Sequence, residues 1–202
     1  MPSNEYCKFL NLPDTFFNKE QLMDDLKHDL LTTGYNNGAG RHWRNWGYQD
    51  TPFNQQAIDW ASSLGCVIAN AEVFYTKPGG TLSWHVDMNP PGPISKINFV
   101  WGSTDDLTDH LMEFGDIKNP DVVKPTMATR VNSNYISYET SEITNITPFV
   151  LDKPALLNVG RPHRVINRSI TGRWCLCLIL FKNNKRIMWD DALSLFSEYV
   201  LV

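Results

Sequence analysis

Apolar positions repeat with a helical period in the first third of the chain. A helix is predicted from Asn18 to Gly34, because Asn18 and Gln21 form a capping-box-like start to a leucine repeat. The repeat consists of Leu22, Leu26 and Leu30. Such a helix is expected to lie with its leucine face on an apolar surface.

A second helix is predicted with Thr51 as its N-cap, Pro52 at its first position and Gly65 at its end. Between the two helices, residues 36–48 are rich in Gly, Asn, Trp and Arg and show no period. This stretch is predicted to be a surface loop that overhangs a site. The apolar stripe of the second helix is Ala57, Ile58, Ala61 and Leu64.

From Cys66 onward the pattern changes to short β-rich runs that are separated by turn residues. Residues 77–80 predict a turn, with Pro at the second position and Gly at the third. An antiparallel sandwich or barrel is expected, because no crossover helices separate the runs. The predicted strands are 66–75, 81–87, 94–101, 155–159, 164–167 and 173–181.

Two stretches complete the chain. Residues 103–149 mix acidic positions, prolines and a polar run, which is typical of an edge hairpin or a substrate lid. Residues 190–199 predict a short terminal helix with Leu193 and Phe196 on one side. We therefore expect helical support in 1–65, a β core in 66–182 and a C-terminal helix in 183–202.

Composition indicates one globular domain. The chain has 202 residues, of which 42% are hydrophobic and 20% charged, so it is long enough to enclose a small-molecule site. The net charge of −4 argues against nucleic acid or an anionic membrane as partner.

The location of the protein is expected to be cytoplasmic. The longest apolar run, 175–181, is too short to cross a bilayer, and the N-terminus lacks the features of a signal peptide. Cys175 and Cys177 are two positions apart in an apolar strand, so both side chains point to one side, as buried thiols rather than a disulfide. A reducing compartment agrees with this cysteine usage.

Candidate chemistry begins at the strand end that carries His85 and Asp87. Side chains two apart in a strand face the same side, so this imidazole and this carboxylate converge. Together with open positions they suit non-haem iron(II). A hydrogen-bonded surface or turn pair is the alternative interpretation of an isolated His-x-Asp.

The third ligand candidate is His163. It follows a small apolar strand and a Gly/Pro turn, which would present the imidazole from one strand towards a site that another strand shares. A structural role is the alternative for a single histidine. The remaining histidines lack such a setting and are predicted to lie on the surface or in loops: His28, His42 and His110.

Ten residues beyond His163, Arg173 opens a strand that is apolar on both faces. Such a strand is expected to be central, and a guanidinium at its head requires an anionic partner because an unpaired buried charge is costly. The partner is either a protein carboxylate or a bound dicarboxylate. Exposure at the strand end is the third possibility.

Taken together, His85-Val86-Asp87, His163 and Arg173 resemble the motif of the iron(II)- and 2-oxoglutarate-dependent oxygenase superfamily. The resemblance covers residues 75–181. It implies a mainly β fold with flanking helices, a double-stranded β-helix or jelly-roll, cupin-like barrel. The local sequence at 77–80 and 163–169 is similar to that of the aspartyl/asparaginyl β-hydroxylase-like branch. Some members of that branch hydroxylate free amino acids such as proline.

The resemblance also implies the chemistry. His85, Asp87 and His163 would hold Fe(II), while Arg173 would bind the far carboxylate of 2-oxoglutarate. With O2, a dioxygenase of this kind hydroxylates a C–H bond and releases succinate and CO2. The presence of Asp87 favours hydroxylation, because halogenating relatives replace that carboxylate.

The group that would help Arg173 to bind the co-substrate carboxylate, and the identity of the substrate, are less directly indicated. Some relatives pair the arginine with a serine two positions on, where this chain has Cys175, so Tyr75 is predicted to supply the hydroxyl. A small molecule, an amino acid or a peptide is the expected substrate. Arg161 and Arg164 are candidates to bind a substrate carboxylate, with simple exposure at a turn as the alternative. Trp43, Trp46 and Trp101 are candidates to line the entrance, with burial in the core as the alternative.

Three other functions remain open on the sequence. A cupin-type metal enzyme would use a similar barrel without 2-oxoglutarate and would not need Arg173. In a non-catalytic β-sandwich binding module the histidines, the aspartate and the arginine would be incidental. Nucleic-acid demethylation is disfavoured by the acidic balance of charge.

Overall fold

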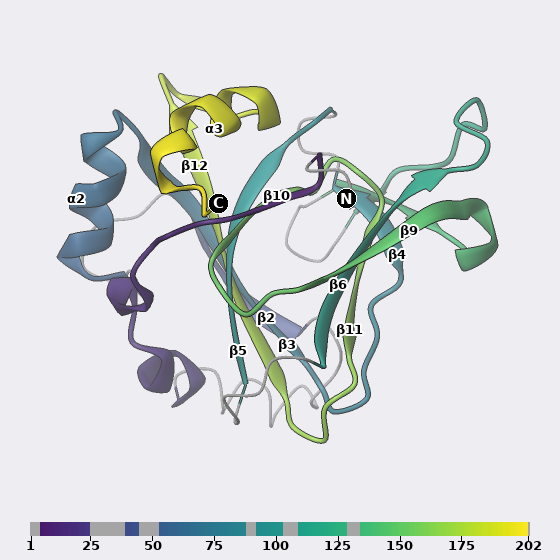
Figure 1. Ribbon diagram of the computed structural model, residues 1–202, viewed down its shortest axis with the longest axis horizontal. Coiled ribbons are helices and arrows are strands. Elements are labelled where there is room, and N and C mark those ends of the chain that lie inside the picture. The colour runs from purple at the N-terminus through teal and green to yellow at the C-terminus, as the bar shows by residue number, and fades with distance from the viewer. Residues whose placement is uncertain are drawn as a thin grey trace.

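The fold was analysed in a computed structural model, which describes residues 5–24, 39–44, 53–87, 92–102, 109–128 and 134–201. Two antiparallel sheets dominate this part of the chain (Figure 1). The mainly β prediction with antiparallel pairing is therefore confirmed. Within the described ranges, no helix is both long enough and apolar enough to span a membrane.

The larger sheet has the strand order β1-β10-β5-β12-β3-β2, with β13 paired to β12. Its most central strands are also its longest, because both faces of these strands are covered. The strands are β1 (Cys7–Phe9), β2 (Ala39–Arg44), β3 (Val67–Thr76), β5 (Ser95–Gly102), β10 (Ala155–Asn158), β12 (Arg173–Lys182) and β13 (Lys185–Arg186).

The smaller sheet has the order β7-β8-β4-β11-β6-β9 and lies across from the larger one in Figure 1. Its strands β4 and β11 are neighbours although 78 positions separate the residues that pair, His85 and His163. The strands are β4 (Trp84–Asp87), β6 (His110–Ile117), β7 (Met127–Ala128), β8 (Asn134–Tyr138), β9 (Ile143–Val150) and β11 (His163–Asn167).

The helices α2 and α3 flank the larger sheet on the side away from β6 and β9 (Figure 1). Residues 19–24 are helical, and the predicted cap is confirmed because Asn18 Oδ1 accepts a 3.0 Å hydrogen bond from the Gln21 amide. Leu26 and Leu30 lie outside the described residues. The other helical elements are α2 (Gln55–Ser63), α3 (Trp189–Leu195), η1 (Asp14–Phe16), η2 (Thr140–Glu142) and η3 (Ser197–Tyr199).

The predicted start of the second helix was wrong. Phe53 forms a β-bridge with Phe17, so the helix begins only at Gln55, with Asn54 as the N-cap whose side chain accepts from the Ala57 amide. The predicted end is confirmed, since Gly65 follows the helix with a φ of 68°.

Two stretches without a clear period form strands. Residues 39–44 were predicted to be loop but form β2, which pairs along β3 and so satisfies backbone groups that would otherwise be an open sheet edge. Within 103–149 the described residues contain β6, β7, β8 and β9. The edge hairpin predicted there corresponds to β7 and β8.

Strand β12 separates two kinds of surroundings. Trp174, Leu176 and Leu178 face the core between the larger sheet and the helices. The alternate residues Arg173, Cys175 and Cys177 are equally buried but face the space between the two sheets. Part of that space is a second apolar core, made of Tyr6, Cys7, Ile94, Met112, Phe114, Leu151, Ala155, Leu157 and Val159.

Candidate metal centre

His85 and Asp87 come from β4, two positions apart and so on the same face of the strand. The Nδ1 atom of His85 lies 2.8 Å from the backbone carbonyl oxygen of Ser83. Because a carbonyl only accepts, this contact places the proton on Nδ1 and leaves the Nε2 lone pair free for a ligand. His85 Nε2 lies 4.0 Å from Asp87 Oδ1.

His163 reaches the same point from β11. Its strand pairs antiparallel with β4, His163 stands opposite His85, and the centroids of the two imidazoles are 4.2 Å apart. The Nδ1 atom of His163 lies 2.9 Å from the carbonyl oxygen of Arg161, so its Nε2 is also the atom left for a ligand.

These three side chains form a candidate metal site. Their ligand atoms all lie within 4.8 Å of one another, which is the separation that binding to one ion requires. Both histidines are oriented in the same way, because each Nδ1 contacts the backbone carbonyl oxygen of the residue two positions earlier. Two imidazoles and one carboxylate are the donor set that suits a divalent transition metal.

The electrostatics of the site keep His163 and Asp87 in their metal-binding forms. Burial and the neighbouring His85 lower the pKa of His163 to about 3, so its imidazole is neutral near pH 7. Burial opposes the charge of Asp87, but Lys96, His163 and His85 outweigh it and lower the pKa of this carboxyl. A neutral imidazole and an ionised carboxylate are both ready to bind a cation.

Arg173 lies at the head of β12, with only 2% of its surface exposed. Its Nε and Nη2 atoms have no hydrogen-bond partner within the described residues. Burial lowers the pKa of its guanidinium, and the Cys175 thiol within hydrogen-bonding reach is a poor substitute for an anion. The salt bridge and the exposed strand end considered from the sequence are therefore not observed in the part of the chain that is described.

Two more buried polar atoms without a partner among the described residues come from the strands beside β12. Thr76 stands opposite Arg173 in the β3–β12 register, and its hydroxyl oxygen Oγ1 is one of them. Asn98 stands opposite Cys177 in the β5–β12 register, and its Oδ1 is the other. Directly paired residues share a face of the sheet, so these groups face the same interior space as Arg173.

Tyr75 is one position away from that face. It stands opposite Trp174, and the two rings meet edge to face with centroids 4.9 Å apart in the core under the helices. The register therefore favours Thr76 over Tyr75 as the hydroxyl beside Arg173. Sequence reasoning missed Thr76 because a shift of one residue moves every side chain to the other face of a strand.

His110 is buried, contrary to the sequence-based prediction of a surface or loop position. It is the first residue of β6 and has no exposed surface. A Cβ atom added at Gly102 would lie 2.6 Å from its Cε1, and Gly102 stands opposite Arg173. The imidazole thus occupies room that the missing side chain of Gly102 leaves. His42 forms part of β2 and His28 lies outside the described residues.

The arginines beside His163 differ in their surroundings. Arg164 is committed to the protein, because its Nε donates a 2.7 Å hydrogen bond to Glu113 and its guanidinium lies over the ring of Trp84. Trp84 is itself buried. Arg161 is exposed, so it remains the candidate for a substrate carboxylate.

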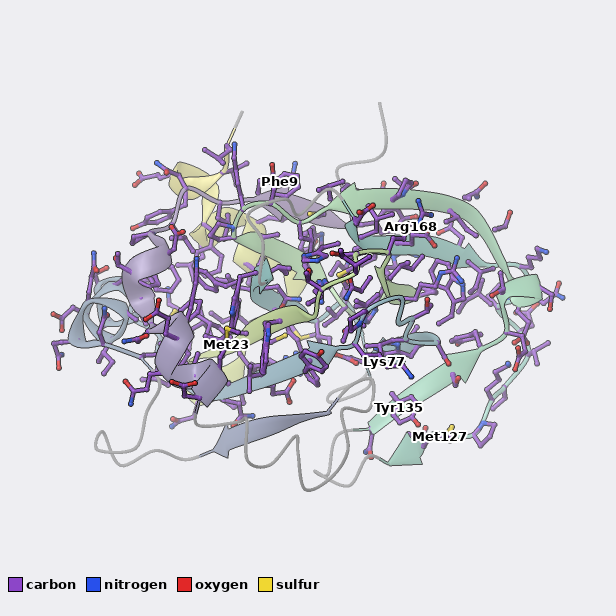
Figure 2. All side chains as sticks on the ribbon, turned by 90° about the horizontal axis from the view of Figure 1, so that it is seen from below. Phe9, Met23, Lys77, Met127, Tyr135 and Arg168 are labelled. Carbon is purple, nitrogen blue, oxygen red and sulfur yellow. The ribbon has the colours of Figure 1, made fainter. Side chains whose placement is uncertain are left out.

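Of the tryptophans predicted at an entrance, Trp101 belongs to the core under the helices and stacks on Trp174. The side chains of Trp43 and Trp46 lie outside the described residues. An aromatic group that does lie near the site is Tyr135 of β8, whose ring centroid is 6.3 Å from that of His85. Figure 2 labels Tyr135 near Met127, its neighbour across the β7–β8 pair.

Cys175 and Cys177 are buried thiols on the interior face, as predicted, with their sulfur atoms 3.7 Å apart. This separation exceeds the length of a disulfide bond. All four cysteines of the chain are free and buried.

Comparison with known proteins shows likeness in structure only. No family profile matches the sequence, and no curated protein sequence is significantly similar to it. Among solved structures, AviO1 from Streptomyces viridochromogenes is 11% identical, with a TM-score of 0.47 over 90% of this chain and 91% of that chain. EvdO2 from Micromonospora carbonacea, solved with 2-oxoglutarate, is 12% identical, with a TM-score of 0.34 over 68% of this chain and 64% of that chain.

EvdMO1 is 14% identical, with a TM-score of 0.51 over 89% of this chain and 48% of that chain. This chain therefore spans about half the length of EvdMO1. Identities this low concern the fold alone.

Proposed function

We propose that this protein is an iron(II)- and 2-oxoglutarate-dependent dioxygenase that hydroxylates a C–H bond. The observation that carries the proposal is the combination of two features in one interior space. His85, Asp87 and His163 converge within 4.8 Å, and Arg173 is buried with Nε and Nη2 unpaired among the described residues. A metal site explains the first feature, and a bound carboxylate would explain the second.

The proposal includes a double-stranded β-helix. Its support is the way successive strands alternate between the sheets, with β3 and β5 in the larger sheet and β4 and β6 in the smaller. The return half alternates in the same way, with β9 and β11 in the smaller sheet and β10 and β12 in the larger. In such an arrangement the ends of β4 and β11 and the head of β12 face one interior.

Fe(II) would be held by Nε2 of His85, Nε2 of His163 and a carboxylate oxygen of Asp87. Two histidines and one carboxylate that leave other positions open are the donor set of non-haem iron oxygenases. When bound, the iron supplies the activation of O2, with 2-oxoglutarate as the co-substrate that is converted to succinate and CO2. The protein's own residues hold the ligands in place through the Ser83 and Arg161 carbonyls.

Arg173 would bind the far carboxylate of 2-oxoglutarate by a charge-assisted bidentate pair. Thr76 stands opposite it, and Asn98 lies on the same face four residues further along β12, opposite Cys177. The Thr76 hydroxyl is able to donate to a carboxylate oxygen. The three ligands of the metal all come from the smaller sheet, whereas Arg173, Thr76 and Asn98 come from the larger one. The co-substrate would therefore bridge the two sheets.

We propose a small molecule, an amino acid or a peptide as substrate. The net charge of −4 gives the protein as a whole no attraction for nucleic acid. Tyr135, close to His85, is the described aromatic residue that we expect to contact the substrate. A cytoplasmic location remains the expectation from the sequence.

The test uses purified protein without oxygen, to which Fe(II) and then 2-oxoglutarate are added. We expect the weak visible charge-transfer band of an iron-bound 2-oxoacid in the wild type, and none in His163→Ala. In Arg173→Ala the concentration of 2-oxoglutarate needed for half-maximal band intensity should rise by about ten-fold or more, since a hydrogen-bonded charge pair is lost. The matched control is Arg168→Ala, which removes an exposed arginine.

Two results would contradict the proposal. A band that persists without His163 would show that the metal binds elsewhere. Metal binding that needs His163 but is indifferent to 2-oxoglutarate would instead favour a cupin-type enzyme without this co-substrate. Once the band is established, succinate formation over free amino acids and peptides identifies the substrate.

A further inference from the structure

Lys96 is a buried cation that neither the motif nor the co-substrate accounts for. It lies on β5 with 12% of its side chain exposed, and its Nζ is 2.9 Å from Asp87 Oδ2. The same Nζ is 2.9 Å from Glu72 Oε2 on β3. One lysine therefore joins the metal-ligand carboxylate of the smaller sheet to an acid of the larger sheet.

The two oxygens of Asp87 have different neighbours. Oδ1 is the atom 4.0 Å from His85 Nε2, whereas Oδ2 is the atom that Lys96 binds. A carboxylate is able to bind a metal through one oxygen or through both. An ammonium group on Oδ2 leaves Oδ1 as the oxygen that faces the imidazoles.

We propose that Lys96 is a positioning residue that restricts Asp87 to a single metal-binding oxygen. This inference rests on the metal site proposed above. Three protein donor atoms leave more of the coordination sphere open than four, and an oxygenase that takes up a chelating co-substrate and O2 needs those open positions. Lys96 keeps a position open by occupying Oδ2.

Glu72 keeps Lys96 in place. Its carboxylate is 5% exposed, and it gives the ammonium a second charged contact besides Asp87. A lysine bound to Asp87 alone would retain freedom along its four-carbon stem, and a second charged contact removes part of that freedom. The arrangement also leaves none of the three buried charges without an opposite charge beside it.

Metal affinity by itself does not test this role, because two effects of removing Lys96 oppose each other. Loss of a nearby positive charge favours a bound cation, while loss of the contact that orients Asp87 disfavours it. The number of open coordination positions separates the two effects, since charge alone does not change it.

The experiment loads the protein with Mn(II) and counts its exchangeable water ligands from the relaxation of water protons. With octahedral Mn(II) and three protein donor atoms, the wild type should hold roughly three waters. In Lys96→Met, Asp87 is free to bind through both oxygens, so the number should fall by about one. Glu113→Gln is the matched control, because it breaks a partly buried ion pair with Arg164 that does not touch Asp87.

A double variant, Lys96→Met with Glu72→Gln, guards against a folding defect from a stranded glutamate. It should show the same loss of one water as the single variant. An unchanged number of waters in both variants would overturn the role of Lys96 and leave the metal site intact. A loss seen in the single variant only would also overturn it, because the stranded Glu72 would then be the cause.

Failure of the proposed function looks different. If wild-type protein binds no Mn(II), or binds it equally well in His163→Ala, the metal site is absent and both proposals fall. If Mn(II) binds with three waters but none is displaced by 2-oxoglutarate, the co-substrate is wrong while the role of Lys96 stands.

Discussion

At the scale of single residues, the interior between the sheets contains polar groups that do not satisfy one another. Arg173, Thr76 and Asn98 each keep a buried polar atom without a hydrogen-bond partner in the described ranges. A buried polar group without a partner costs roughly 1–3 kcal/mol, so three of them on adjacent strands indicate a ligand that pairs with them.

Thr76 and Tyr75 are therefore distinguishable by experiment. Thr76→Val should weaken 2-oxoglutarate binding by about ten-fold, since one hydrogen bond to a charged carboxylate contributes about 1.5 kcal/mol or more. Tyr75→Phe should leave the affinity close to that of the wild type, because its ring lies on the opposite face of the sheet. Titration of the charge-transfer band measures both; equal losses would restore Tyr75 as the ligand.

At the scale of elements, the edge strand β1 contributes a buried thiol to the core between the sheets. Strand β1 extends the larger sheet by pairing with β10, and Cys7 on it stands opposite Leu157 in the apolar core between the sheets. Burial there raises the pKa of the Cys7 thiol to about 12. Because its neutral form is favoured on folding, Cys7 links the stability of β1 to pH.

The direction of this linkage follows from the proton count. Between pH 9 and 12 the unfolded thiol loses its proton while the folded one keeps it, so Cys7 lowers the free energy of unfolding as pH rises. In Cys7→Ala that loss is absent. We expect the variant to be less stable at pH 7 because of lost packing, and the difference to narrow by pH 10, as measured by urea unfolding. A difference that stays constant would contradict the prediction.

At the scale of the whole molecule, the proposed ligands would join the two sheets. The metal would stabilise the smaller sheet by joining β4 to β11. The bound 2-oxoglutarate would connect the smaller sheet to β12 of the larger one. A ligand that binds only the folded state stabilises it by about 2.7 kcal/mol at a hundred times its Kd.

Thermal unfolding should show this in two steps. For a domain of this size, such stabilisation by the metal should raise Tm by roughly 5–10 °C. Anaerobic 2-oxoglutarate should raise Tm further. His163→Ala should abolish both increments, whereas Arg173→Ala should lose only the second. A second increment that survives in Arg173→Ala would place the co-substrate elsewhere.

Much of this protein was predictable from local pattern. Alternating apolar runs predicted most of the strands, and the spacing of His85 and Asp87 predicted that they face one side, because strand periodicity is a property of a few consecutive residues. The convergence of His163 with them was also predicted, through the motif. The strands within 39–44 and 103–149 could not be predicted from the sequence. They are stabilised by pairing with distant partners rather than by a hydrophobic pattern of their own.

Only the tertiary structure decided which residues meet between the sheets. The sequence by itself determined a mainly β chain with a convergent imidazole and carboxylate. The fold decided that Thr76 rather than Tyr75 faces Arg173, that His110 is buried, and that Lys96 binds Asp87. The physical reason is that register and sheet order are set by backbone pairing between segments far apart in the chain, and a shift of one residue reverses the face that each side chain occupies.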